Sequence, residues 1–222
     1  MIGHGKPDKP DKSDWAPREI CAAMLERIAA WLDEPPSEPT IAQLQSPEGQ
    51  VLLDAIAQEF DARAAIAQLR AALAAGPAST LALDIAVDWT RLFEGVMGAP
   101  TVPLYESAYA DDPARPAARL FGCAVDEMNE LLVRFDVSLA SQREPADHVS
   151  VELALYAVLL RRHDADGIAL MRERLSRWVP ALIELCRLND PGGFHGAVAS
   201  LLGVLLQHAP GLESQEWSHH AE

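Results

Sequence analysis

Apolar residues recur along most of the chain at the three- and four-residue spacing of an amphipathic helix, and no stretch alternates like a strand. The first helix is predicted over residues 17–33 and ends before Pro35-Pro36. Its apolar positions are Ile20, Met24, Ile28, Trp31 and Leu32. A second helix is predicted to begin at Ser46-Pro47, since serine caps free amides and proline fits the first turn. One face of it is expected to carry Val51, Leu52, Ile56 and Phe60.

The same spacing predicts eight further helices, separated by glycine, proline and polar links. They are expected at residues 66–76, 79–93, 114–121, 126–135, 145–162, 168–178, 180–188 and 194–207. Two glycines and two prolines in residues 95–103 (GVMGAPTVP) predict a loop. About ten helices and no strand predict an all-α fold, a single-domain helical bundle over residues 15–210.

Both ends of the chain differ from this bundle. Residues 1–14 combine charge and proline without apolar periodicity, which predicts a disordered tail. Residues 211–222 are predicted to form an acidic tail. Between them, aromatic residues are scarce, at 6% of the whole chain, and alanine and leucine supply much of the apolar content. That composition favours helix over sheet.

The chain has 18 Lys+Arg against 33 Asp+Glu, a formal net charge of −15. This charge argues against binding of nucleic acid or of anionic membranes, because phosphate would repel it. No apolar run reaches the roughly 18 residues of a membrane span, and the N-terminus lacks the apolar stretch of a secretory signal. Cys21, Cys123 and Cys186 lie among apolar residues, which predicts buried thiols without a disulfide or a zinc site. A cytoplasmic protein is therefore expected.

Two stretches carry more polar and aromatic character than core packing needs. Residues 103–109 read PLYESAY and follow the predicted loop, and residues 144–153 read EPADHVSVEL. Glu144, Asp147 and His148 are predicted to share the first turn of a helix, where carboxylates are favoured by the helix dipole. Helix capping alone and a binding function both explain that cluster.

Together with residues 88–93 (DWTRLF), these motifs resemble the TorD/DmsD family of redox-enzyme maturation chaperones, over residues 81–207. The resemblance implies a cytoplasmic, all-helical chaperone that binds the twin-arginine signal peptide of a molybdenum enzyme. It further implies that export is delayed until the cofactor is inserted. The E-P-x-D-H motif resembles the trimethylamine oxide and dimethyl sulfoxide reductase branch more than the nitrate reductase branch.

The resemblance implies a signal-peptide groove formed by two groups of residues. These are Glu144, Pro145, Asp147 and His148, and then Tyr105, Glu106, Ser107 and Tyr109. Because carboxylates form forked hydrogen bonds with guanidinium groups, Glu106, Glu144 and Asp147 are expected to hold the two arginines. Trp89 and Phe93, four residues apart on one helix face, could line the apolar part of the groove. Core packing is the simpler explanation for both, and equally for Trp178.

The same motif residues also allow a catalytic function. The alternative function is a small helical metal-dependent hydrolase that uses Glu144, Asp147 and His148. The order His148, His163-Asp164, Asp190 mimics a metal-dependent phosphohydrolase, but 15 helical residues would separate the two histidines by about 22 Å.

No cofactor is expected, since no phosphate-binding glycine motif occurs. Guanine nucleotide and pterin, to which the family has been linked, cannot be assigned to any residue. The expected partners are a twin-arginine signal peptide and the apo form of a molybdoenzyme catalytic subunit. The resemblance allows a monomer or a helix-exchanged dimer, with residues 95–103 as a plausible hinge.

Overall fold

The structure is a computed structural model of the chain. It describes residues 15–95, 98–110, 113, 122–138 and 143–208. Three predictions lie outside these residues: the tail at 1–14, the helix at 114–121 and the tail at 211–222.

Nine α-helices form within the described residues, together with one π-helical turn and one 3-10 turn. The α-helices are α1 (Trp15–Asp33), α2 (Glu38–Gln45), α3 (Pro47–Glu59), α4 (Arg63–Leu73), α5 (Ala78–Trp89), α6 (Cys123–Arg134), α7 (Val149–Arg162), α8 (Ala165–Asn189) and α9 (Phe194–His208). The π turn η2 (Thr90–Glu94) continues α5, and η3 (Glu106–Tyr109) is the 3-10 turn. The described residues contain no strand, only one isolated antiparallel bridge between Tyr105 and His148. The predicted all-α fold is confirmed.

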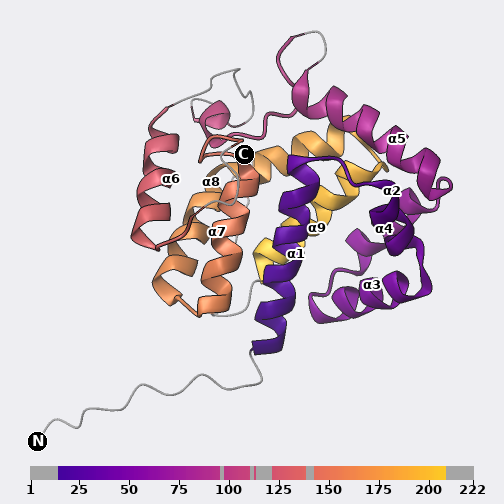
Figure 1. Cartoon of the computed structure of the whole chain (residues 1–222), viewed down its shortest axis with the longest axis horizontal. Coiled ribbons are helices and arrows are strands. Elements are labelled where there is room, and N and C mark those ends of the chain that lie inside the picture. Colours follow the sequence, from indigo (N-terminus) through magenta and orange to yellow (C-terminus); the bar gives the residue numbers. More distant parts are fainter. Residues whose placement is uncertain (1–14, 96–97, 111–112, 114–121, 139–142, 209–222) are drawn as a thin grey trace, which may run out of the picture.

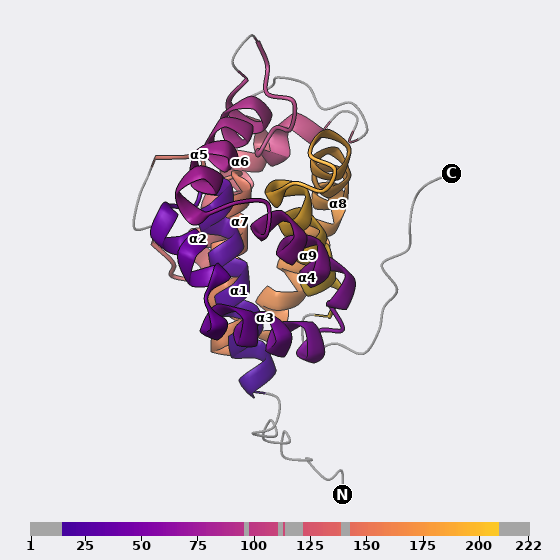
Figure 2. The same cartoon turned by 90° about the vertical axis from the view of Figure 1, so that its right-hand side faces the viewer.

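Helix α1 runs through the middle of the bundle (Figure 1). It packs most extensively against α7 and also contacts α9. Helices α6, α7 and α8 lie on one side of α1, and helices α2 to α5 lie on the other (Figure 1). The turned view places α4 beside α9, and these two helices are in contact (Figure 2). Helix α9 therefore joins the two halves, because it also packs against α8.

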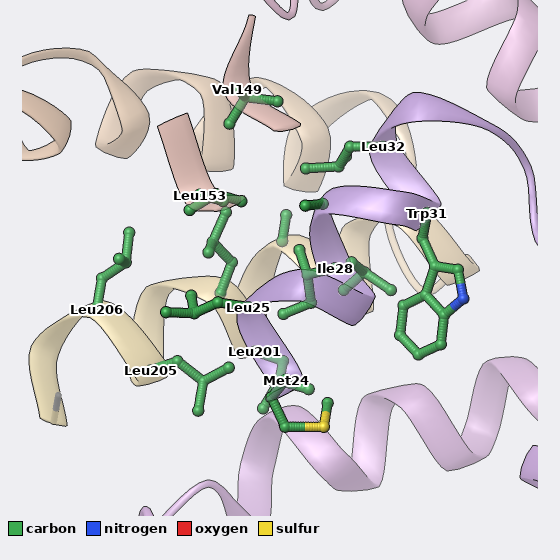
Figure 3. Packing of buried hydrophobic residues seen from close by; sticks show 14 of the residues in the cluster. Met24, Leu25, Ile28, Trp31, Leu32, Val149, Leu153, Leu201, Leu205 and Leu206 are labelled. Carbon is green, nitrogen blue, oxygen red and sulfur yellow. The ribbon is translucent and has the colours of Figure 1, made fainter. Parts of the chain in front are cut away.

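The core lies where α1, α7 and α9 meet (Figure 3). Leu25 and Ile28 of α1, Leu153 of α7, and Leu201 and Leu205 of α9 are fully buried there. Burying a side chain of this size contributes about 1.5–3 kcal/mol relative to leaving it in water. This apolar contact fixes the position of α7, whose amino-terminal end carries the predicted site.

Helix α2 was absent from the predicted set. Pro35-Pro36 does follow the end of α1, but the chain resumes a helix at Glu38 with Pro39 in its first turn. Proline is tolerated there because the first amides of a helix have no partner within the helix. The buried side chain of Ile41 anchors this short helix to the core.

Two predicted boundaries are wrong. The helix expected from residue 145 begins at Val149, because His148 caps it and residues 145–147 form the turn before it. The break expected at Pro180 is absent, and α8 continues to Asn189. Pro180 lies on the exposed side of α8, while Trp178, Val179 and Leu182 remain buried, so packing maintains the helix across it.

Two predicted burial patterns also need correction. Val51 and Leu52 are 68% and 52% exposed, because the buried face of α3 is formed by Leu53, Ile56 and Ala57, and Phe60 follows directly after the helix. Cys123 is exposed at the first position of α6, whereas Cys21 and Cys186 are buried as predicted.

None of the described helices is by itself long and apolar enough to cross a membrane. Helices α4 and α5 with η2 reach that length and apolarity only as a pair bent by 110°.

Candidate functional site

The two motif stretches lie side by side. The Val149 amide donates to the Leu104 carbonyl at 2.8 Å, and the Glu106 amide donates to the Asp147 carbonyl at 3.0 Å. These two bonds form the bridge between Tyr105 and His148. Leu104 and Val149 are buried on the core side of the pairing, so burial of apolar side chains supports the backbone contact. The structure thus brings together residues that are some forty positions apart in the sequence.

Tyr105, Glu144 and His148 form the centre of this junction. The Tyr105 hydroxyl donates to Glu144 Oε2 at 2.6 Å. The ring of Tyr105 meets the ring of His148 edge to face, with 5.0 Å between the centroids. Tyr105 and Glu144 are partly exposed, whereas His148 is buried. One hydroxyl and one carboxylate therefore reach the surface beside a buried imidazole.

His148 caps the start of α7. Its Nδ1 accepts from the Ser150 amide at 3.2 Å and lies 2.7 Å from Ser150 Oγ. Ser150 Oγ also lies 3.3 Å from Asp33 Oδ1, at the carboxyl end of α1. The site consequently includes a residue from α1 that the sequence analysis did not single out.

Burial sets the protonation of both rings. Burial, the bond to Glu144 and neighbouring carboxylates raise the pKa of Tyr105 above its ordinary value, so the phenol keeps its proton. Burial lowers the pKa of His148, although the nearby charges of Glu144, Asp33 and Asp147 oppose that shift. His148 is therefore neutral at neutral pH, which agrees with Nδ1 acting as a hydrogen-bond acceptor.

The carboxylate of Asp147 is 1% exposed. Its Oδ2 accepts from the Ser107 amide at 3.1 Å, while Oδ1 has no hydrogen-bond partner among the described residues. Ser107 is itself buried. Asp147 therefore ties η3 to the start of α7, and its predicted contact with a guanidinium group stays a prediction.

Glu106 belongs to a second cluster, formed around the buried Arg174 of α8. Arg174, only 4% exposed, pairs with the carboxylates of Glu106, Glu127 and Glu152 and donates to the Ala124 carbonyl at 2.9 Å. The distance from Arg174 Nη1 to Glu127 Oε2 is 3.1 Å, and that from Nε to Glu152 Oε1 is 3.4 Å. The cluster links η3, α6, α7 and α8 through one guanidinium group.

Glu152 is the most buried carboxyl of this cluster, with no exposed surface, and the Trp178 indole donates to its Oε2 at 3.2 Å. Burial and the neighbouring Glu106 raise the pKa of Glu152 well above its ordinary value, against the attraction of Arg174. Burial likewise raises the pKa of Glu106. Arg174 is not among the predicted site residues. The signal was present, because Arg174 shares the helical spacing of the buried Met171, Leu175 and Trp178.

The part of the chain that carries both motif stretches matches a known protein family. The family model described as "Nitrate reductase delta subunit" matches residues 55–184. That range includes both motif stretches and the Arg174 cluster. The chain belongs to this family. Three similar proteins are each named "Chaperone protein TorD".

The TorD protein of Aeromonas salmonicida (strain A449) is 30% identical over 189 residues, which cover 77% of this chain and 80% of the relative. That of Vibrio cholerae serotype O1 (strain M66-2) is 29% identical over 185 residues, covering 77% and 81%. That of Shewanella piezotolerans (strain WP3 / JCM 13877) is 28% identical over 169 residues, covering 73% and 77%. The predicted family is confirmed, and it is a family of chaperones rather than of enzymes. The choice between its branches stays a prediction.

The remaining predicted site residues of this TorD-family chain fall into two groups. Tyr109 is buried, its hydroxyl donates to the Pro103 carbonyl at 2.8 Å, and its ring lies 5.3 Å from that of Trp178, so both aromatic residues belong to the core. Phe93 is also buried. Trp89 is half-buried, and its indole donates to the Leu32 carbonyl at 3.3 Å, next to Asp33. Pro145 is half-buried beside Glu144.

The metal-hydrolase alternative depended on Glu144, Asp147 and His148 sharing an ion. In the described part of the TorD-family chain, no group of three or more His, Cys, Asp or Glu side chains is arranged to hold one. The three side chains are engaged instead with Tyr105, Ser107 and Ser150, respectively. No observation in the structure favours the hydrolase.

Proposed function

We propose that this chain is a cytoplasmic chaperone for the maturation of a molybdenum-containing oxidoreductase. In this proposal it binds the twin-arginine signal peptide of the apo catalytic subunit and delays export until the cofactor is inserted. The observation that carries the proposal is the meeting of the two motif stretches at one surface, within the residues that the family model matches. The names of the TorD relatives support the chaperone part of it.

The chemistry of the junction suits an arginine side chain. The carboxylate of Glu144 is partly exposed and forms no ion pair among the described residues, so its second oxygen can accept from a guanidinium group. The ring of Tyr105, held beside Glu144, offers an aromatic surface on which a guanidinium group can stack. The half-buried indole of Trp89 is available for the apolar residues that follow the arginines in such a peptide.

Titration with a synthetic peptide tests the proposal. The probe carries two consecutive arginines followed by an apolar stretch, and binding is measured by isothermal calorimetry. Glu144→Gln keeps the hydrogen bond from Tyr105 but removes the charge, so affinity is expected to fall about tenfold, or about 1.4 kcal/mol.

Glu59→Gln is the matched control, since Glu59 is exposed at the end of α3 and forms no ion pair among the described residues. The Glu59→Gln variant should bind the arginine peptide with the same affinity as the wild type. A second peptide, with both arginines replaced by lysine, should bind more weakly because lysine cannot form the forked bonds. Failure of the wild-type chain to bind the arginine peptide would contradict the proposal.

A further inference from the structure

The geometry points to Asp33, the last residue of α1, as a second arginine-binding carboxylate beside Glu144. This inference rests on the proposed function and extends its site beyond the motif residues. Asp33 lies outside residues 55–184, the range matched by the family model. It comes from the helix that packs against α7, so the tertiary fold brings it to the junction.

A continuous series of contacts connects the two carboxylates. Asp33 Oδ1 lies 3.3 Å from Ser150 Oγ, which lies 2.7 Å from His148 Nδ1. His148 meets the ring of Tyr105, whose hydroxyl donates to Glu144 at 2.6 Å. Asp33 and Glu144 therefore stand at opposite ends of one aromatic and polar unit. Two carboxylates in this arrangement suit two consecutive arginine side chains, which diverge from an extended backbone.

The surroundings of Asp33 leave it in need of a donor. Ser150 has one hydroxyl proton, and both the neutral Nδ1 of His148 and the carboxylate of Asp33 compete for it. Among the described residues, Asp33 forms no ion pair, whereas the adjacent Glu34 pairs with Arg143. A carboxylate at the carboxyl end of a helix also faces the negative end of the helix dipole. A bound guanidinium group would relieve both unfavourable conditions.

Asp147 supplies an independent observation at the same place. Its Oδ1 is buried and has no hydrogen-bond partner among the described residues, and its charge acts on both Tyr105 and His148. A buried carboxylate oxygen without a hydrogen-bond donor is unfavourable, because it has lost its contact with water and gained none in return. The junction thus contains more acceptors than the described residues satisfy, as expected for a site that takes a ligand rich in N–H donors.

The position of Trp89 gives the bound peptide a direction. Its indole donates to the Leu32 carbonyl, one residue before Asp33. A peptide whose arginines lie at Glu144 and Asp33 would therefore present its following apolar residues toward Trp89.

Asp33→Asn tests this inference against Glu34→Gln, an adjacent substitution that removes the same charge. The asparagine keeps an acceptor for Ser150, so thermal unfolding should show no loss of stability. Affinity for the twin-arginine peptide is expected to fall about tenfold in Asp33→Asn and to stay within about twofold of wild type in Glu34→Gln. Two further peptides, each with one arginine replaced by glutamine, show which arginine Asp33 binds. With the peptide that lacks this arginine, Asp33→Asn should cause no further loss of affinity.

The outcomes separate the two hypotheses. If the wild type binds the peptide but Asp33→Asn binds it equally well, or if both variants lose the same affinity, Asp33 is not an arginine-binding residue and the proposed function stands. If the wild type does not bind the twin-arginine peptide, the proposed function itself is wrong.

Discussion

Three carboxylates that look equivalent in the motifs occupy different environments. Glu144 is partly exposed and accepts from Tyr105, Asp147 is buried and holds a backbone amide, and Glu106 pairs with Arg174. The sequence predicted one shared groove for all three and could not distinguish their environments. Their environments depend on partners that are distant in the sequence, such as Arg174 for Glu106 and the Ser107 amide for Asp147, and local spacing does not show which partner each carboxylate meets.

The bond between Asp147 and the Ser107 amide makes a prediction about stability. Asp147→Ala removes this buried hydrogen bond to the Ser107 amide, so the free energy of unfolding should fall by about 1–3 kcal/mol. Urea unfolding followed by circular dichroism measures the change. Asp54→Ala, at an exposed site on α3 that pairs with Arg70, should cost less than about 1 kcal/mol. Equal losses in the two variants would show that Asp147 has no special structural role.

The raised pKa of Glu152 predicts how stability depends on pH. The pKa of Glu152 is near 4.5 in the unfolded state and higher in the folded state, so the folded state holds the proton more tightly. The contribution of Glu152 to stability is therefore complete below pH 4.5 and is lost as the pH rises toward the folded-state pKa. Glu152→Gln removes this dependence. The stability of the wild type relative to the variant should therefore decrease between pH 4.5 and pH 8 in urea titrations. An increase would mean that the attraction of Arg174 outweighs burial.

At the scale of whole elements, apolar periodicity predicted most helices and failed near two prolines. Pro39 lies within the first turn of α2, a helix that was not predicted, and Pro180 lies within α8, where an interruption had been predicted. The effect of a proline depends on whether it occupies a first turn or an exposed face held by packing, which the residue type alone does not reveal. The start of α7 was also misplaced. The helix was predicted from Pro145, but His148 caps it and it begins at Val149.

Helix α9 contains two glycines whose environments differ. A Cβ at Gly196 would lie 2.3 Å from the Asp190 carbonyl oxygen, whereas a Cβ at Gly203 would lie 3.5 Å from Ile183 Cδ1. Gly196→Ala should therefore destabilise the protein by about 1–3 kcal/mol, because the backbone must shift. Gly203→Ala should stabilise it by about 0.5–1 kcal/mol through helix propensity. Thermal unfolding of the two variants checks both signs, and a loss of stability in Gly203→Ala would contradict the packing described for α9.

For the molecule as a whole, the net charge of −15 bears on association with a basic partner. Opposite charges accelerate encounter, and salt screens that effect. Affinity for the twin-arginine peptide should fall several-fold between about 50 mM and 500 mM NaCl, mainly through the association rate, as measured by stopped-flow fluorescence. A peptide lacking both arginines serves as the control and should show little dependence. Equal salt dependence of the two peptides would contradict the prediction, because attraction between the acidic protein and the two arginines would then not explain the effect of salt.

The packing of α1 against α7 and α9 has a consequence for how the protein is made. During synthesis α1 emerges before the helices that cover its apolar face, because α7 and α9 lie more than a hundred residues later in the chain. Contacts so distant in sequence form slowly, and an uncovered apolar helix is prone to aggregate in the meantime. Most of the core can therefore assemble only after α9 has left the ribosome, so this chaperone is expected to need protection during its own folding.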